Sequence, residues 1–282
     1  MIKTAEESGR KKFTCSGLWY IIIMYKSVLT LWISAHLWKQ QIKARQEMAQ
    51  SNCKEFIGTA ALDTIGMVIA GVDGTLLENM HVDKSYRALG ILTARCGAAG
   101  QFLAMDDAVK MTNTEVVTVE LPLDAKTWGG HGCYVVVGAD SVEDCRNAVQ
   151  IALRLTDKYV GEVYMSDSGH LEFCYSASAG KVLEKAVQAE RGKAYGFMTG
   201  SPAGIGLVMA DNALKASPVD LIWEMSPHHG TTHFSNEVMI SFKGDAGNVW
   251  EAVMAGRRVG LDLLGSFGNE IVSATTPYYD DL

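Results

Sequence analysis

The sequence predicts two consecutive copies of one small α/β domain, of the α+β kind in which helices form ferredoxin-like layers on a sheet. Three observations predict this fold: a motif that returns about 105 residues later, the same order of strand and helix patterns in both halves, and a length of 282 residues, which suits two ordinary domains. We place the first copy at 54–160 and the second at 161–272. An N-terminal extension at 1–47 and a C-terminal tail at 273–282 flank them.

The repeat is clearest around one strand and the helix that follows it. Arg87–Thr93 (RALGILT) returns as Lys193–Thr199 (KAYGFMT), and Asp106–Lys110 (DDAVK) returns as Asp211–Lys215 (DNALK). Further matches continue beyond both helices in the same register. A correspondence of this length indicates two domains that share one fold.

In each copy the elements are expected in the order β-β-α-β-α-β-β-α. Segments 58–73 and 161–176 each have the pattern of two short strands around a turn. A short helical stretch follows each of them, at 76–80 and at 182–189. The repeated motif then supplies a strand, a Gly-rich turn and a helix.

The last strands and helices of the two copies are also paired. Cys133–Gly138 matches Val238–Gly244, and each run leads into a final helix. The first of these helices begins at Ser141 with a capping pattern, and its apolar residues fall on one face. Its counterpart is expected from about 246 to 260. Both helices should therefore pack on the sheet of their own copy.

The charge balance argues against nucleic acid as a partner. The formal net charge is −7, and residues 1–47 hold eight Lys and Arg against three Asp and Glu, so the remaining body has a net charge of −12. Binding to nucleic acid depends on Lys and Arg that neutralise phosphates. The six Cys include no C-x-x-C pair, so the sequence contains neither a zinc knuckle nor a redox motif.

Residues 1–47 have no counterpart in the repeat. Their apolar stretch, Leu18–Trp38, approaches the roughly 20 residues that span a bilayer, but Lys26 interrupts it. Two interpretations stay open: an upstream extension that is not normally translated, with Met48 as the natural start, or a real tail that docks cargo or a membrane. In either case we expect this segment to be poorly ordered in isolation, and we do not expect a membrane to be the main partner.

The motifs of the repeat resemble a known family. Ala88–Arg95 (ALGILTAR), a Gly-rich turn and Asp107–Val117 (DAVKMTNTEVV) are similar to the core of bacterial microcompartment shell domains. Two such domains in one chain, each starting late in the usual order of elements, resemble the circularly permuted tandem class. The likeness covers essentially everything after Asn52. Three further segments resemble members from propanediol and ethanol utilisation compartments: Glu55–Thr59, Thr114–Pro122 and Ser226–Gly230.

This resemblance implies a structural protein and not an enzyme. It implies a flat homotrimer whose six domains imitate a hexamer, and which tiles with other shell proteins around cargo enzymes of a propanediol, ethanol or ethanolamine pathway, in the shell of a bacterial microcompartment. It also implies that a Lys at the end of the motif's helix meets its mate across neighbouring tiles. Lys110 and Lys215 match that tile-edge position, although a solvated helix Lys would look the same.

Two loops are the candidate pore segments, because the resemblance points the loop between the last paired strands of each domain at the symmetry axis. They span 123–132 and 226–235. Gly in the first loop permits the backbone to approach the axis and a small polar solute, such as a diol, alcohol or aldehyde. The candidate residues are Trp128, Gly129, Gly130, His131, Gly132, Pro227, His228, His229, Gly230 and His233.

Other uses of these loops stay open. His228, His229 and His233 from three protomers would surround one axis, where they could bind a metal or act as a pH-sensitive gate, but no carboxylate or Cys stands beside them at ligand spacing. We therefore predict no metal site and no cofactor. A small-molecule-binding or sensing trimer of the same fold is the alternative function.

The sequence gives little support for catalysis. The Gly-rich turns at 96–100 and 200–206 lie between a strand and a helix, but neither matches a complete phosphate-binding fingerprint, and the shared fold explains their recurrence. His170, near Glu172, belongs to no catalytic motif, and we interpret it as a structural loop histidine. No catalytic residue is predicted.

Overall fold

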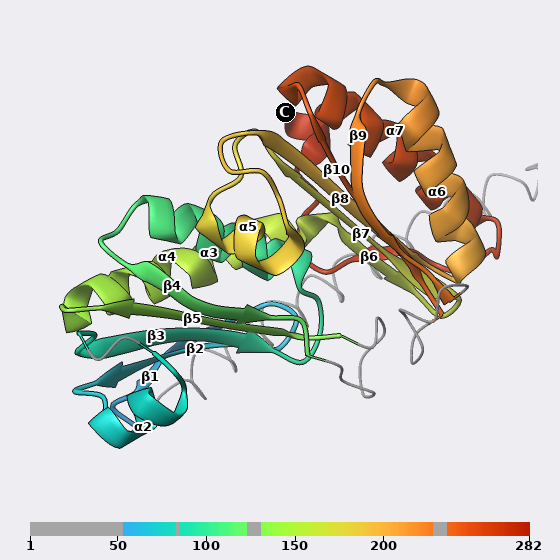
Figure 1. Ribbon diagram of the computed structural model, residues 1–282. Coiled ribbons are helices and arrows are strands. Elements are labelled where there is room, and N and C mark those ends of the chain that lie inside the picture. The colour runs from blue at the N-terminus through green and yellow to red at the C-terminus, as the bar shows by residue number, and fades with distance from the viewer. Residues whose placement is uncertain (1–52, 83–84, 123–130, 228–235) are drawn as a thin grey trace, which may run out of the picture. The chain divides into compact units, whose positions relative to one another are not determined.

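Two antiparallel sheets, one from each half of the chain, organise the protein (Figure 1). The computed structural model describes residues 53–82, 85–122, 131–227 and 236–282. Residues 53–282 form one unit. The N-terminal extension and the central parts of both candidate pore loops lie outside the described residues.

The first half contains a five-stranded sheet in the order β1-β2-β3-β5-β4. Its elements follow the predicted succession of strands and helices. They are β1 (Phe56–Ala60), β2 (Thr64–Ala70), α2 (Gly74–Asn79), β3 (Ala88–Ala94), α3 (Ala99–Lys110), β4 (Glu115–Glu120), β5 (Cys133–Ala139) and α4 (Val142–Tyr159).

The second half contains a six-stranded sheet in the order β11-β6-β7-β8-β10-β9, and the predicted fold class is confirmed. Its final helix is five residues longer than expected, because the apolar pattern continues to the buried Leu264. The elements are β6 (Val163–Ser166), β7 (Gly169–Ser176), α5 (Lys181–Val187), β8 (Ala194–Ser201), α6 (Ala203–Ala216), β9 (Asp220–Met225), β10 (Val238–Gly244), α7 (Ala246–Gly265) and β11 (Val272–Ser273).

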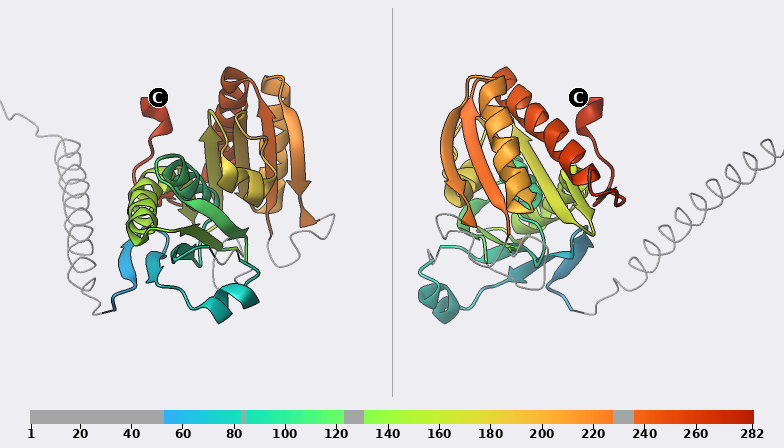
Figure 2. Two further views of the ribbon diagram at one scale, coloured as in Figure 1. Left: turned by 60° about the vertical axis from the view of Figure 1, so that its left-hand side comes forward. Right: turned by 90° about the vertical axis from the view of Figure 1, so that its right-hand side faces the viewer.

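Each sheet carries its two long helices on one face (Figure 2). In the first half, α4 lies so close to β2 that a Cβ atom at Gly66 would come within 2.5 Å of the Val149 side chain. In the second half, α6 and α7 pack against β8, and a Cβ at Gly256 would meet the sulfur of Met198. Glycine is therefore required where the helices approach most closely.

Helix α3 belongs to both halves. It packs beside α4, and its other side contacts β7 and α5 of the second half. Phe102 of α3 lies in one apolar cluster with Cys174, Leu183 and Tyr195, which come from the second half. The core of the first domain thus continues across the domain boundary, and α3 forms one wall of the contact between the domains.

The C-terminal segment ties the domain junction to α7. Glu162, in the short 3-10 turn between the halves, is fully buried, and its carboxylate accepts hydrogen bonds from the backbone N–H of Tyr278 and Tyr279 at 2.8 Å each. Arg257 of α7 donates to the same carboxylate at 2.8 Å and to Asp280 at 3.0 Å. These contacts fix the linker, the last helix and the tail to one another.

Candidate functional site

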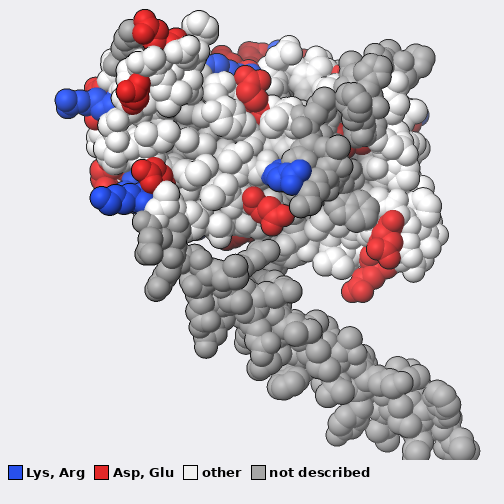
Figure 3. All heavy atoms as spheres, turned by 90° about the horizontal axis from the view of Figure 1, so that it is seen from below, with Lys and Arg blue, Asp and Glu red and all other residues white. Residues whose placement is uncertain are grey.

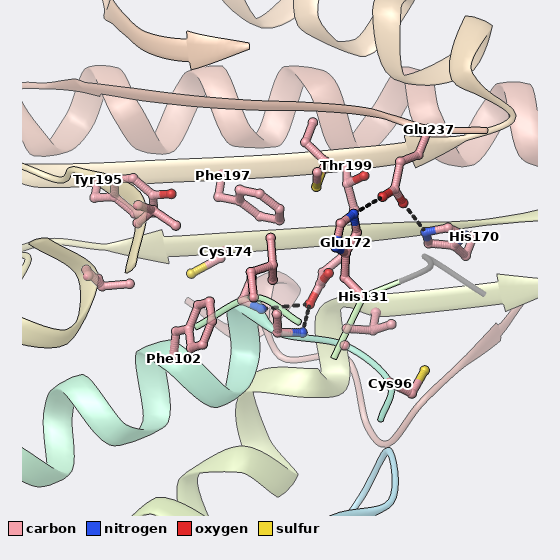
Figure 4. Close-up of a pocket in the computed structure, with 18 of the residues that line it drawn as sticks. Cys96, Phe102, His131, His170, Glu172, Cys174, Tyr195, Phe197, Thr199 and Glu237 are labelled. Atoms are coloured by element: carbon pink, nitrogen blue, oxygen red, sulfur yellow. Dashed lines mark hydrogen bonds and ion pairs between the residues drawn. The ribbon is translucent and has the colours of Figure 1, made fainter. Parts of the chain in front are cut away.

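A cavity of about 60 Å³ lies where helix α3 of the first half meets the sheet of the second half (Figure 4). A single water needs about 10–15 Å³ on this measure, so the cavity has room for about four to six water-sized groups. This is about the size of a three-carbon diol or a short aldehyde. Its lining comes mainly from the N-terminal end of α3, helix α5, and strands β6, β7, β8, β9 and β10.

One wall of the cavity is apolar and aromatic. Phe102 of α3 and Tyr195, Phe197 and Trp223 of the second sheet line it. The Phe197 and Trp223 rings lie 6.2 Å apart, and the indole N–H of Trp223 donates to the backbone oxygen of Val187 at 2.8 Å. Because its polar atom is satisfied by the backbone, the indole presents a fixed apolar surface.

The opposite end of the cavity is polar. The Glu237 carboxylate lies between two imidazoles: Nε2 of His131 is 3.4 Å from one oxygen, and Nε2 of His170 is 3.3 Å from the other. His131 lies two residues before β5 in the first half, whereas His170 on β7 and Glu237 before β10 belong to the second. Only 2% of the Glu237 side chain is exposed, so the three side chains form a buried bridge between the domains.

A second carboxylate, that of Glu172 on β7, faces the start of α3. One of its oxygens accepts hydrogen bonds from the backbone N–H of Ala99 at 3.2 Å and of Ala98 at 3.5 Å. An acidic group suits this place, because the first N–H groups of a helix lack partners and carry the positive end of the helix dipole. Burial raises the pKa of Glu172, and the nearby Glu237 carboxylate raises it further, while His170 and the two N–H groups lower it.

The cysteines around this carboxylate are poor nucleophiles. Burial raises the pKa of the Cys133 thiol to about 12 and that of the Cys174 thiol well above its ordinary value, and the Glu172 carboxylate contributes to both increases. A thiol must lose its proton to react or to bind a metal. These buried groups therefore act as small apolar side chains at neutral pH.

A third carboxylate fastens α3 to the second domain further along the helix. Asp106 is fully buried and accepts hydrogen bonds from the backbone N–H of Gly180 (2.8 Å), Val182 (2.9 Å) and Leu183 (3.2 Å) at the start of α5. Glu172 thus caps a helix of the first domain, and Asp106 caps a helix of the second. The domain contact is held by two reciprocal charge-assisted interactions.

The two tile-edge candidates have different surroundings. Lys110 contacts the carboxylates of Asp106 (2.9 Å) and Asp107 (3.1 Å) and donates to the backbone oxygen of Ser178 (2.7 Å), with 37% of its side chain exposed. Lys215 is paired with Asp211 at 2.7 Å and is 74% exposed. Lys110 is therefore partly committed to the domain contact, whereas Lys215 lies at the surface.

Three pore candidates can be placed. His131 is buried against Glu237, and Gly132 has its Cα so near β3 that a Cβ would come within 2.3 Å of the Ala94 oxygen. Pro227 follows the end of β9. The remaining candidates lie outside the described residues: Trp128, Gly129, Gly130, His228, His229, Gly230 and His233.

Sequence reasoning noted Glu172 near His170 but gave it no role, missed Glu237, and misplaced one histidine. His170 lies on strand β7 and not in a loop, because the chain turns at 167–168, before it. The alternation of polar and apolar residues along β7 indicates a strand. His170 and Glu172 point to one face, and the apolar Leu171 and Phe173 point to the other. Glu237 had no such signal, since it lies between a loop and the apolar run of β10.

Backbone N–H groups at the two Gly-rich turns already donate hydrogen bonds to side chains of the protein. The N–H groups of Ala98 and Ala99 face Glu172, and the N–H of Ala203 donates to the side-chain oxygen of Asn236 at 3.2 Å. Among the described residues, no group of three or more His, Cys, Asp and Glu side chains could hold a metal ion. In the same part of the chain, no helix has the length and apolar character needed to cross a membrane.

Charged side chains do not gather by sign on the face shown in Figure 3. Within the described part of that face, most basic residues lie close to acidic ones, in small groups on a mostly uncharged surface. Proteins that bind nucleic acid present a clustered basic patch to the phosphates. No clustered basic patch of this kind is visible on the described part of this face.

Comparison with known proteins places both halves in one family. The family model described as the BMC domain matches residues 88–167 and again 194–276. The bacterial microcompartment shell protein PduB of Citrobacter freundii is 46% identical over 225 residues, which cover 79% of this chain and 83% of that protein.

Two solved structures resemble the chain closely. The crystal structure of EtuB from Clostridium kluyveri is 47% identical, with a TM-score of 0.76 over 80% of this chain and 99% of that one. The crystal structure of a trimeric bacterial microcompartment shell protein PduB is 46% identical, with a TM-score of 0.75 over 80% of this chain and all of that one.

Proposed function

Because the chain belongs to the BMC-domain family, we propose that it is a structural tile of a bacterial microcompartment shell, which forms a trimer and admits small polar solutes through the cavity between its two domains. Its role is structural and not enzymatic. The observation that supports a solute passage is the cavity itself. Both domains line it, and it has an aromatic side and a polar end.

The trimer is supported by a difference between repeat-related helices. Phe102 on α3 is 2% exposed because it packs against the second domain, whereas its repeat-mate on α6, Leu207, is 60% exposed. The neighbouring pair behaves in the same way, with Leu103 buried and Val208 exposed. Large apolar side chains at such positions are typical of a surface that another protein covers.

A second copy is the partner that fits this surface. In one chain, α3 packs against α5, where Val182 is fully buried. The corresponding residue of α2 is Leu76, because both stand twelve residues before the next strand, and Leu76 is 44% exposed. We therefore place α6 of one protomer against α2 of the next, so that six similar domain contacts surround the trimer axis.

The tile edge and the pore loops complete the proposal. Lys215, and to a smaller extent Lys110, would meet their counterparts on neighbouring shell proteins. The loops at 123–132 and 226–235 would lie near the trimer axis, and cargo enzymes of a diol, alcohol or aldehyde pathway would lie on one side of the sheet. What supports these assignments is the match of the two lysines and two loops to the family pattern.

The passage is tested by ligand-observed saturation-transfer NMR on the full-length trimer, with propane-1,2-diol as the probe. Cys96 lines the cavity, so Cys96→Trp should fill it and abolish transfer to the diol. The exposed Cys53, which does not line the cavity, gives the matched control Cys53→Trp, which should retain transfer. Equal transfer in both variants would overturn the cavity as the solute site.

Assembly is tested on the same preparations. Sedimentation equilibrium should give three times the monomer mass, and electron microscopy at higher concentration should show flat sheets or tubes. A trimer that binds the diol but never tiles, alone or with hexameric shell proteins, would favour a sensing protein of the same fold.

A further inference from the structure

We infer that Glu237 and Glu172 make the interdomain cavity a filter against anions, so that small neutral hydroxyl compounds enter while carboxylates of the same size are excluded. This inference rests on the proposed passage and concerns its selectivity. It is carried by the placement of two buried carboxylates against the two features of the cavity that would otherwise attract an anion.

The first such feature is the pair of imidazoles. His131 and His170 are the side chains at the polar end that belong to a residue type able to carry positive charge. Glu237 lies between them, at 3.4 and 3.3 Å from their Nε2 atoms. A proton on either ring therefore forms an ion pair within the protein, and an entering carboxylate meets no cation that lacks a counterion.

The second feature is the N-terminus of α3. Its first N–H groups point toward the cavity and would form an anion site of the kind that binds phosphates and carboxylates. Glu172 occupies that position, with one oxygen 3.2 Å from the Ala99 nitrogen. The helix dipole is thus satisfied by the protein's own acidic group, and a second carboxylate there would lack a hydrogen-bond donor.

The other residues around the cavity do not compensate a negative charge. None of the described lining residues is Lys or Arg, and the remaining ionisable groups are thiols and a tyrosine: Cys96, Cys174 and Tyr195. Transfer of an unpaired carboxylate into such a site costs far more than transfer of a hydroxyl group. An anionic solute would therefore lose its hydration without gaining an unpaired Lys or Arg among the described lining residues.

A neutral hydroxyl compound finds suitable partners in the same place. Carboxylates and unprotonated imidazole nitrogens accept hydrogen bonds from O–H groups. Nδ1 of His170 is buried and has no hydrogen-bond partner among the described residues. The carbon skeleton of the solute would lie against Phe197 and Trp223. The cavity therefore matches a small molecule with hydroxyl groups at one end and an apolar remainder.

The repeat shows that these carboxylates are not needed by the fold. Glu172 pairs with Thr199 in the second sheet, and at the equivalent position of the first sheet Ile65 pairs with Thr93. Glu237 precedes β10, and its counterpart before β5 is Gly132. The domain folds with Ile and Gly at these positions, so the acidic pair belongs to the cavity between the domains of one chain.

The test compares three solutes of similar size on the wild-type trimer at pH 7.5 by saturation-transfer NMR: propane-1,2-diol, lactate and lactamide. Lactamide has the shape of lactate without its charge. We expect transfer to the diol and to lactamide, and at least roughly tenfold weaker transfer to lactate, which corresponds to a tenfold difference in affinity. Equal transfer to lactate and lactamide would overturn the filter.

The variant Glu237→Gln identifies the group responsible. It removes the carboxylate that lies between the two imidazoles, so an entering anion meets less negative charge at the polar end. Transfer to lactate should therefore rise at least roughly tenfold and approach that of lactamide. Glu190→Gln is the matched control, because this exposed carboxylate pairs with Lys243 away from the cavity. Unchanged exclusion of lactate in a folded Glu237→Gln trimer would contradict the role of Glu237.

The outcomes separate the filter from the passage on which it rests. If the wild type binds the diol, lactamide and lactate alike and Cys96→Trp blocks all three, the passage stands and the filter fails. If Cys96→Trp leaves binding unchanged, the proposed passage fails. The comparison of lactate with lactamide uses only the wild-type protein, so the filter stays testable even where Glu237→Gln does not fold.

Discussion

Helices α3 and α6 occupy equivalent places in the two domains, yet their surroundings differ. Helix α3 is covered by its own domain on one side and by the second domain on the other, so Phe102 and Asp106 are buried. Their repeat-mates on α6, Leu207 and Asp211, are exposed in the single chain. The same sequence pattern therefore forms a contact within the chain in one half and presents an uncovered surface in the other.

This difference teaches how a tandem tile divides its contacts. The contact made within the chain has become specialised, because buried acidic and imidazole groups surround a cavity there. The surface left for a second copy has apolar residues and an exposed ion pair between Lys215 and Asp211. We expect substitutions in α3 to act on folding, and the same substitutions in α6 to act on assembly.

The largest effect is expected for the aromatic residue of α3. Phe102→Ala removes a fully buried ring and should lower the free energy of unfolding by about 3–5 kcal/mol. Leu207→Ala should lower it by less than about 0.5 kcal/mol in the dissociated chain, while weakening the trimer in sedimentation at decreasing concentration. Urea unfolding of both variants provides the measurement. Equal losses of stability in the two variants would contradict the proposed difference between α3 and α6.

A smaller effect is expected for the paired aspartates. Asp106→Ala leaves three N–H groups of α5 without their acceptor and Lys110 without its nearest carboxylate, and should lower the free energy of unfolding by about 2–4 kcal/mol. Asp211→Ala breaks an exposed pair with Lys215 and should lower it by less than about 1 kcal/mol. Thermal unfolding of the two variants at one protein concentration distinguishes them.

The two edge lysines sharpen the comparison further. Lys110→Asp and Lys215→Asp should both prevent sheet formation in electron microscopy while the trimer persists. Lys110→Asp should also lower the melting temperature, because it places a negative charge beside Asp106, Asp107 and the Ser178 oxygen. Lys215→Asp should leave the melting temperature nearly unchanged, since it repels only the exposed Asp211. If either variant still forms normal sheets, the lysine that it replaces has no role at the tile edge.

The smallest effect concerns pH. The folded chain holds the Glu172 proton more tightly than the unfolded chain does, because burial raises the pKa of this carboxyl group in the folded state. Stability is therefore lost as pH rises from the ordinary pKa through the raised one. Glu172→Gln keeps the acceptor for the α3 N–H groups and cannot ionise, so its melting temperature relative to wild type should increase toward alkaline pH.

The control for this effect comes from the other half. Ile65, at the position equivalent to Glu172, should show no such dependence when replaced by Val. A constant difference between Glu172→Gln and the wild type from pH 4 to pH 9 would contradict the assigned shift.

The repeat, the order of elements and the fold class could be predicted, because apolar periodicity and repeated motifs are local features of a sequence. The cavity could not, because His131, His170 and Glu237 are far apart in the sequence and meet only when two domains pack. His170 is predicted as a loop residue but lies on β7, although the alternation of polar and apolar residues around Leu171 indicates a strand. The roles of Lys110 and Lys215 and of the pore loops stay predictions.

The central claim is that α6 of one copy packs on the next copy as α3 packs on α5 within a chain. In the chain, Asp106 accepts a hydrogen bond from Val182, so their repeat-mates Asp211 and Leu76 should meet between protomers. A protein with Asp211→Cys and Leu76→Cys, oxidised as a trimer, should give covalently linked trimers on a denaturing gel, whereas each single variant should not. A stable trimer that forms no such links would contradict the account.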